Sequence, residues 1–142
     1  MSYPVSQYHF QVEWGGKSIG FLEVSGLDIE IVPLENRDGS SPEYSNIKMP
    51  GHLKYSDIIL TRRIHKGDND FFNWINTARL NTVERRDVVV ALLDGNHEPI
   101  VIWKLRNSFP IKYIGPILKA NEQGIATESL VLTHEGMTVE NV

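Results

Sequence analysis

The chain has 142 residues, which suits one domain built around a single hydrophobic core. Hydrophobic residues make up 41% and charged residues 23% of the sequence, as in ordinary globular proteins, so disorder and fibrous repeats are not indicated. Cysteine is absent, which excludes disulfides and thiolate metal sites. The net charge is −4, and no basic cluster is denser than Arg62-Arg63 or Arg85-Arg86, so a surface that binds nucleic-acid phosphates is not expected.

Membrane insertion is not expected either. The N-terminal segment MSYPVSQYHF contains neither the basic region nor the apolar core of a signal peptide. No apolar run approaches the roughly 20 residues that a membrane-spanning helix needs. We therefore expect a protein that folds in water.

The first predicted element is a half-buried strand over residues 8–14, where aromatic or aliphatic side chains alternate with polar ones. Gly15-Gly16 supplies the positive φ angles of a two-residue hairpin turn, so residues 17–24 are predicted to return as the partner strand. After Ser25-Gly26, residues 27–33 alternate again and are predicted as a third strand with a polar face.

Residues 36–52 contain enough Gly, Pro and Asp-Gly signals to predict an irregular loop over most of their length. A loop this long inside a compact domain is usually functional or disordered. This one, with the start of the strand predicted over residues 53–64, carries apolar residues that a disordered linker does not favour. They are Tyr44, Ile47, Met49, Pro50, Leu53 and Tyr55. We predict that they form contacts between subunits, with folding of the loop back onto its own domain as the alternative.

One helix is predicted, with Asp68 as its N-cap and its end near Asn81. Asp70 falls in the first turn, where a carboxylate meets the positive end of the helix dipole. One apolar stripe follows at positions i, i+3, i+4 and i+7, formed by Phe71, Trp74, Ile75 and Ala78.

The C-terminal part is predicted to consist of strands. Residues 88–93 are apolar at every position, which predicts a central strand covered on both faces, one of them by the helix. The turn signal Asp94-Gly95-Asn96 predicts a hairpin to residues 100–105, which residues 109–114 can extend past a break at Asn107-Ser108. A last strand is predicted over residues 125–134. This order of elements indicates a mainly β protein, a β-barrel or sandwich with one helix packed on it.

No pattern indicates catalysis. Gly16-Lys17-Ser18 lacks the first glycine of a phosphate-binding loop, and no two of the five histidines stand at i, i+4. The pairs His97-Glu98 and His134-Glu135 are neighbours on predicted strands, so their side chains point to opposite faces. We expect no enzyme, no cofactor and no metal site, and a monomeric ligand-binding β-barrel stays open as an alternative function.

Several motifs occur in the same order in a known family. They are FQVEW at residues 10–14, FLEVSGLD at 21–28, YSNIKMPG at 44–51, KYSDIILTR at 54–62, KGDNDFFNW at 66–74, HEP at 97–99 and SLVLTHEG at 129–136. With these motifs the sequence resembles the phage tail tube family, the inner-tube proteins of contractile phage tails and phage-tail-like contractile injection systems. The resemblance covers almost the whole chain.

The resemblance implies a single tail-tube domain over residues 1–142, with an assembly loop at about 36–53. It implies a structural protein whose hexameric rings stack into a hollow tube, a conduit for cargo protein or DNA. The implied partners are other copies of the chain, a sheath protein, and baseplate and tail-terminator or cap proteins. Such a subunit is expected to assemble in the bacterial cytoplasm as part of a phage tail or an injection particle.

A hollow tube implies that some residues of each subunit line its channel. We predict that the polar faces of the first hairpin and the third strand do so, through His9, Gln11, Glu13, Asp28 and Glu30. This set carries more acid than base, so it would repel passing DNA and leave a hydrated wall for protein cargo. The alternative is that these residues face solvent or the sheath.

Overall fold

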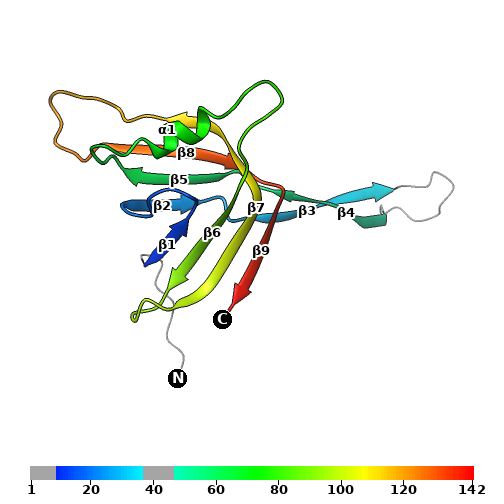
Figure 1. The fold of residues 1–142 in the computed structure, drawn as a ribbon. Helices are drawn as coiled ribbons and strands as arrows, with labels where there is room; N and C mark the ends of the chain where they lie inside the picture. Colours follow the sequence, from blue (N-terminus) through cyan, green and yellow to red (C-terminus); the bar gives the residue numbers. More distant parts are fainter. Residues whose placement is uncertain (1–8, 37–46) are drawn as a thin grey trace.

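The computed structural model of the protein describes residues 9–36 and 47–142. A bent seven-stranded sheet forms the body, and a separate two-stranded ribbon projects from it (Figure 1). The elements are β1 (Phe10–Glu13), β2 (Phe21–Ser25), β3 (Ile29–Asn36), β4 (Ile47–Tyr55), β5 (Ile58–Arg63), α1 (Asp70–Ile75), β6 (Arg86–Leu93), β7 (Pro99–Ile114), β8 (Thr127–Thr133) and β9 (Gly136–Asn141). The prediction of a mainly β subunit with one helix is confirmed, but the sheet does not close into a barrel.

Strand β7 is the central strand, because its 16 residues pair with three other strands. Its first half pairs with β6 and β9, and its second half pairs with β8. The predicted break at Asn107-Ser108 is a bulge within this continuous strand, where Asn107 adopts a φ of 51°. Residues 88–93, predicted as a central strand covered on both faces, lie in β6, an interior strand between β1 and β7 in which Val89 and Leu92 are half-buried and the other four residues are buried.

The core lies on one face of the bent sheet, and α1 packs on it through Phe71 and Trp74. Trp14, Phe71 and Trp74 are fully buried, with 4.9 Å between the ring centroids of Trp14 and Phe71. Aliphatic side chains from five strands complete the cluster: Val12, Ile58, Leu60, Val88, Val90, Leu105, Leu130 and Leu132. Each such side chain contributes about 1.5–3 kcal/mol when it leaves water, so this cluster stabilises the body.

The predicted first hairpin does not form. Strand β1 pairs with β6, and β2 pairs with β5. The cause is Trp14, which is fully buried and donates its indole N–H to the carbonyl of Lys17 at 3.0 Å. A Cβ on Gly16 would lie 2.4 Å from the Trp14 ring, so this glycine makes room for the indole while the chain crosses to another strand.

Helix α1 is shorter than predicted and begins later. Asn69 is its N-cap residue, whereas Asp68 accepts the backbone N–H of Asp70 at 3.1 Å from just outside the helix. Beyond Ile75 the chain tightens into turns, because the Trp74 indole donates to the carbonyl of Glu84 at 2.8 Å and pulls the following loop back. The predicted continuation to Asn81 is therefore wrong, and Ala78 is exposed.

The segment predicted as a loop contains a strand, β4, from Ile47 onward. It pairs antiparallel with β3, and the two form a ribbon that we call the arm (Figure 1). The strand predicted over residues 53–64 is two strands, β4 and β5, because the chain passes from the arm into the body between Tyr55 and Ile58. Residues 37–46, which include Tyr44, lie outside the described part.

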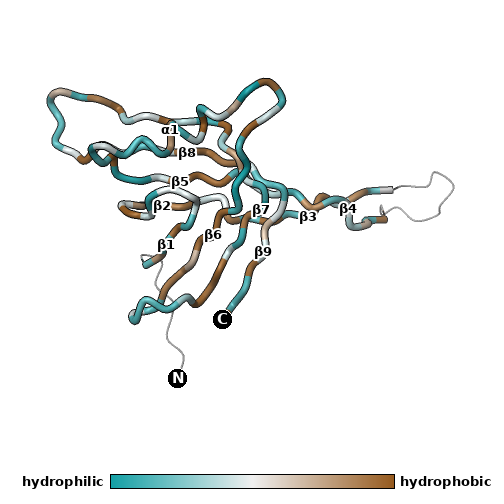
Figure 2. The backbone as a smooth tube through the Cα atoms, in the orientation of Figure 1, coloured by the Kyte–Doolittle hydropathy of each residue, from teal (hydrophilic) through white to brown (hydrophobic). Residues whose placement is uncertain are grey.

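The last predicted strand corresponds to β8, and one further strand, β9, was not predicted. Strands β8 and β9 both run antiparallel to β7 and follow one another along it. Figure 2 shows hydrophobic residues along the strands of the arm as well as those of the body. Within residues 9–36 and 47–142, no helix is long and apolar enough to cross a membrane.

Candidate assembly surfaces

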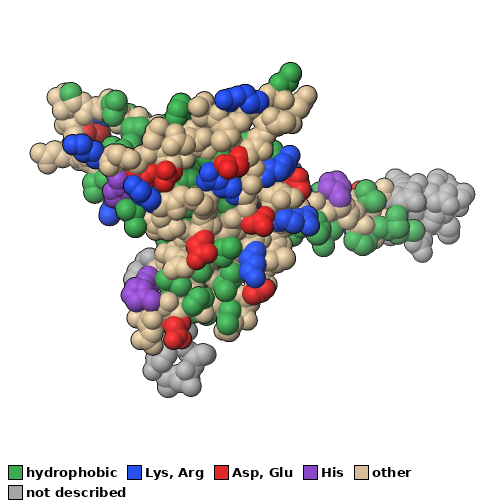
Figure 3. Space-filling model, in the orientation of Figure 1, with side chains coloured by type: hydrophobic (Ala, Val, Ile, Leu, Met, Phe, Trp, Pro, Cys, Tyr) green, Lys and Arg blue, Asp and Glu red, His purple; other side chains and the backbone are tan. Residues whose placement is uncertain are grey.

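The arm stands clear of the body and exposes apolar side chains (Figure 3). Six of its aliphatic residues are between 45% and 58% exposed: Ile29, Ile31, Leu34, Ile47, Met49 and Leu53. A two-stranded ribbon is marginally stable in water unless it packs against something else. The arm therefore has the composition of a contact surface and lacks a cover from the described part of its own chain.

The predicted interface residues fall at different places on the arm. Ile47, Met49 and Leu53 are exposed, and Pro50 stands exposed opposite Pro33. Tyr55 lies at the base, half-buried against the core, with its ring 5.1 Å from that of His134. The described strands of the arm project away from the body (Figure 1), against the alternative of a segment folded back onto its own domain.

A second surface is the four-stranded part of the sheet that we call the wing, formed by β1, β6, the first half of β7, and β9. Strand β1 pairs only with β6, and β9 pairs only with β7 within the described residues. The wing thus ends in an unpaired strand on each side. Unpaired edges offer free backbone N–H and C=O groups to any strand that aligns with them.

The face of the wing that points away from the core is polar at its exposed positions. One row across the strands joins Glu13, Val89, Lys104 and Thr138, and the next joins Gln11, Ala91, Ile102 and Glu140. Gln11 donates to Glu13 over 3.5 Å, and Lys104 pairs with Glu140 at 3.5 Å. This face carries both signs of charge.

The predicted channel residues lie on two elements. His9, Gln11 and Glu13 belong to β1 and the residue before it, whereas Asp28 and Glu30 stand where the arm begins. Sequence reasoning missed Lys104, Thr138 and Glu140, which share the face of Gln11 and Glu13. The signal was present as the alternation of Met137 and Val139 with Thr138 and Glu140, but the last strand was expected to end at His134.

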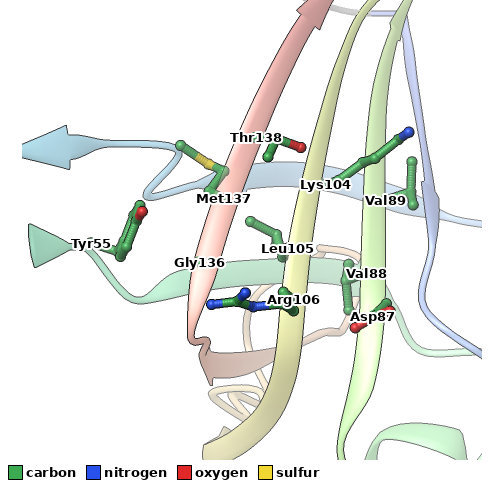
Figure 4. A pocket seen from close by; sticks show the side chains of 10 residues that line it. All are labelled: Tyr55, Asp87, Val88, Val89, Lys104, Leu105, Arg106, Gly136, Met137 and Thr138. Carbon is green, nitrogen blue, oxygen red and sulfur yellow. The ribbon is translucent and has the colours of Figure 1, made fainter. Parts of the chain in front are cut away.

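A shallow pocket of about 360 Å³ lies where the arm meets the wing (Figure 4). Its lining includes Tyr55 from the arm and Gly136, Met137 and Thr138 from β9. The polar groups around it are used by the sheet itself, since Arg106 donates to the carbonyl of Glu135 at 2.9 Å. In the part of the chain that the structure describes, no group of three or more His, Asp or Glu side chains is placed to hold a metal ion.

A buried charge network fixes the segment that leads into α1. Arg62 is 1% exposed and donates two hydrogen bonds to Asp68, at 3.0 and 3.1 Å, and one to Glu128 at 2.9 Å. Its guanidinium lies 4.0 Å from the centre of the Phe71 ring. The Tyr113 hydroxyl donates to the other oxygen of Glu128 at 2.7 Å. The network ties β5, β7 and β8 to the start of the helix.

One carboxyl group and one hydroxyl group of this network have shifted pKa values. Burial alone would raise the pKa of Asp68, but the backbone N–H of Asp70 and the positive charge and hydrogen bonds of Arg62 hold it below its usual value. Burial, the hydrogen bond to Glu128 and the charge of that carboxylate raise the pKa of Tyr113 to about 12. Asp68 therefore stays ionised and Tyr113 stays protonated near neutral pH.

A family model described as T4-like virus tail tube protein gp19 matches residues 6–138 of the chain. The chain belongs to this family. A tail tube protein is a structural component of the inner tube of a phage tail or contractile injection system, and the ligand-binding alternative finds no support.

Solved structures agree with this assignment. The tail tube protein is 33% identical to a chain in the sheath–tube complex of the extracellular contractile injection system PVC, with a TM-score of 0.89, covering 99% of this chain and 93% of that one. It is 31% identical to a chain in the tube terminating cap of the anti-feeding prophage, with a TM-score of 0.90 and coverage of 100% and 94%.

More distant structures share the fold alone. Hcp1 from Flavobacterium johnsoniae is 17% identical to the tail tube protein, with a TM-score of 0.62, covering 95% of this chain and 97% of that one. No curated protein sequence matches the chain.

Proposed function

We propose that copies of this tail tube protein form hexameric rings, and that the rings stack into a hollow inner tube. The observation that carries the proposal is the wing, an open sheet with a different unpaired strand on each side. The whole chain, residues 1–142, acts as one assembly unit, in which the segment at about 36–53 contributes to the arm.

Pairing of the β1 edge of one subunit with the β9 edge of the next is the simplest way to close such a ring. The two edges belong to opposite sides of the same wing, so each contact is head-to-tail and repeats around a rotation axis. Closure joins the wings into one continuous barrel and removes the unpaired edges of the wing. A chain that stayed monomeric would leave both edges open to uncontrolled pairing.

The arm supports self-assembly independently of the wing. We propose that the arm contacts other subunits through Ile47, Met49, Pro50, Leu53 and Tyr55. Tyr44, which lies outside the described part, is proposed to belong to the same contact. Covering an aliphatic side chain that is half exposed recovers part of the roughly 1.5–3 kcal/mol that full burial contributes. Six such side chains on one ribbon give an interface with substantial apolar area.

The face of the wing that points away from the core is proposed to line the channel. His9, Gln11 and Glu13 lie on this side, and Asp28 and Glu30 extend the acidic lining where the arm leaves the body. Lys104 reduces the acidic excess, but it is paired with Glu140. The result is a hydrated wall of mixed charge that offers passing DNA or protein no continuous binding surface.

Further partners are proposed from the solved relatives. Similar chains come from a sheath–tube complex, a sheath and tube terminator, and a baseplate. We propose that this chain likewise contacts a sheath protein, a terminator or cap and a baseplate, and that it assembles in the bacterial cytoplasm. Its role is mechanical and involves no catalysis.

Electron microscopy of the purified chain tests the proposal. Negative-stain images are expected to show rings with six-fold symmetry, and tubes at higher concentration. Native mass spectrometry should give six times the subunit mass for the ring. A chain that remains monomeric at all concentrations, or that saturates with a small-molecule ligand as a monomer, would contradict the assignment.

A further inference from the structure

The arm is an amphipathic ribbon whose apolar face changes side along its length. Paired residues in an antiparallel ribbon share a face, and faces alternate along each strand. Near the base, Ile31 stands opposite Leu53, on the same face as Ile29 two residues earlier, while the other face carries the pair Glu30 and Lys54. The basal half is therefore apolar on one side and charged on the other.

The distal half has the opposite arrangement. Leu34 stands opposite Met49, and Ile47 lies on the same face two residues before Met49, at the distal end of β4. The other face of the distal half carries Glu35 and Lys48, which form an ion pair at 4.0 Å. This charged face lies on the same side of the ribbon as the apolar face of the basal half. The apolar surface thus moves from one side of the ribbon to the other.

A bulge in β4 marks the point of reversal. The register shifts between Ile31 and Pro33, so that three residues of β4 span two residues of β3. Gly51 lies in this bulge, and a Cβ there would be only 2.2 Å from the carbonyl oxygen of Val32. The bulge therefore needs glycine, and the close approach of the two strands fixes the local geometry.

We infer that each arm packs between two other copies of the chain, one on the basal apolar face and one on the distal apolar face. The inference rests on the proposed tube and specifies its contacts. One flat partner cannot cover both apolar patches, because they point in opposite directions. Two separate copies can cover them while the charged faces remain in water.

The basal face contacts the neighbour in the same ring. Tyr55 shares the face of Ile29 and Leu53. It also lines the shallow pocket where the arm meets the wing, beside Gly136 and Thr138 of β9 (Figure 4). The basal face is therefore continuous with the β9 edge, where the next subunit of the ring is proposed to pair. A neighbour seated on that edge also meets Ile31 and Leu53.

The distal face contacts a copy in the adjacent ring. The eight residues of β3 extend about 25 Å at roughly 3.3 Å per residue. The distal half thus lies beyond the strand edge that the ring contact occupies, on the far end of a ribbon that projects from the body (Figure 1). Leu34, Ile47 and Met49 there are free to reach a subunit outside the ring.

Two matched substitutions on β3 test the inference. Ile31→Glu places a charge on the basal apolar face, and Leu34→Glu places the same charge on the distal one, at 54% and 51% exposed positions. A second pair on β4, Leu53→Glu and Met49→Glu, repeats the comparison. Lys48→Gln, on a charged face of the same ribbon, is the control and is expected to assemble as the unchanged chain does.

The basal variants are expected to remain monomeric, and the distal variants to form rings that do not stack into tubes. Native mass spectrometry measures ring formation, and electron microscopy measures stacking. If substitutions on both faces block assembly at the same stage, or if the two stages are reversed, the inference is wrong although the proposed tube remains supported. If the unchanged chain forms neither rings nor tubes, the proposed function itself fails.

Thiol labelling gives a second readout that does not depend on blocking assembly. Because the chain contains no cysteine, Leu53→Cys and Met49→Cys each introduce a single reporter. The thiol at 53 is expected to lose at least ten-fold in maleimide reactivity on ring formation, and the thiol at 49 only on stacking. Simultaneous protection of both thiols would overturn the assignment of two faces to two copies.

Discussion

The body and the arm contain similar aliphatic side chains, but they obtain cover in different ways. Leu60 and Leu130 in the body are fully buried by their own chain, whereas Leu34 and Leu53 in the arm are about half exposed. The body thus covers its own apolar side chains, whereas the arm is proposed to obtain its cover from other copies. Four predictions can break or sharpen this comparison, and they follow in order of expected effect.

Removing the buried cation should destabilise the body most. Arg62→Ala leaves Asp68 and Glu128 buried without their shared partner, which lowers the free energy of unfolding by about 3–5 kcal/mol. Urea unfolding of the monomeric protein measures this change. The matched change in the arm, Lys48→Ala, breaks only an exposed ion pair and should alter stability by less than about 1 kcal/mol. Equal effects would remove the distinction between the two regions.

A pair of leucine truncations compares the two regions directly. Leu60→Ala opens a cavity in the core and should lower the free energy of unfolding by about 2–5 kcal/mol. Leu34→Ala should change the unfolding of the monomer by no more than about 0.5 kcal/mol, because the side chain is already half in water. Leu34→Ala should instead raise the protein concentration at which tubes form, measured by light scattering. Unaltered tube formation would count against the arm as a contact.

Alkaline pH should act on the body through Tyr113. The pKa of the Tyr113 hydroxyl is about 12 in the folded protein, raised from the ordinary tyrosine value of 10.0. The unfolded chain therefore loses the proton first, so stability is intact below pH 10 and falls as the pH rises towards 12. Tyr113→Phe should flatten this part of the stability profile, measured as the urea midpoint at each pH. An unchanged slope in the variant would show that other groups cause the decline.

Charge reversal on the proposed channel wall should leave folding nearly unchanged. Glu13→Lys and Asp28→Lys alter exposed side chains and should change the free energy of unfolding by less than about 0.5 kcal/mol. In assembled tubes they should increase DNA retention at low salt, measured by co-sedimentation, because the wall gains positive charge. Unchanged cargo loading together with no new DNA retention would contradict a channel location.

Local sequence patterns predicted the features that neighbouring residues decide. The alternation around Val12 and Trp14 gave the buried face of β1, and Asp94-Gly95-Asn96 gave the turn between β6 and β7. The first hairpin failed because Gly15-Gly16 carries a strong local turn signal, whereas the burial of Trp14 is decided by contacts with α1, far along the chain.

The arm could be predicted as a surface but not as a strand pair. Pro50 and Gly51 are chain breakers in most settings, and they are tolerated here because β4 is an edge strand with a bulge. Its apolar residues face one another across the two strands but are not covered by the described part of the body, so no pattern of burial against the core marked them as a ribbon. The set Ile47, Met49 and Leu53 was recognisable from composition alone, while its division between two faces required the register.

The unlike edges of the wing give the assembly a direction. Since β1 can meet β9 but not another β1 in the same geometry, all subunits of a ring point the same way around its axis. A ring built in this way has two different faces, and a stack of such rings has two different ends. A protein that starts the tube and a protein that terminates it therefore meet different surfaces, although both bind copies of one sequence. The polarity of the whole tube thus follows from an asymmetry within each subunit.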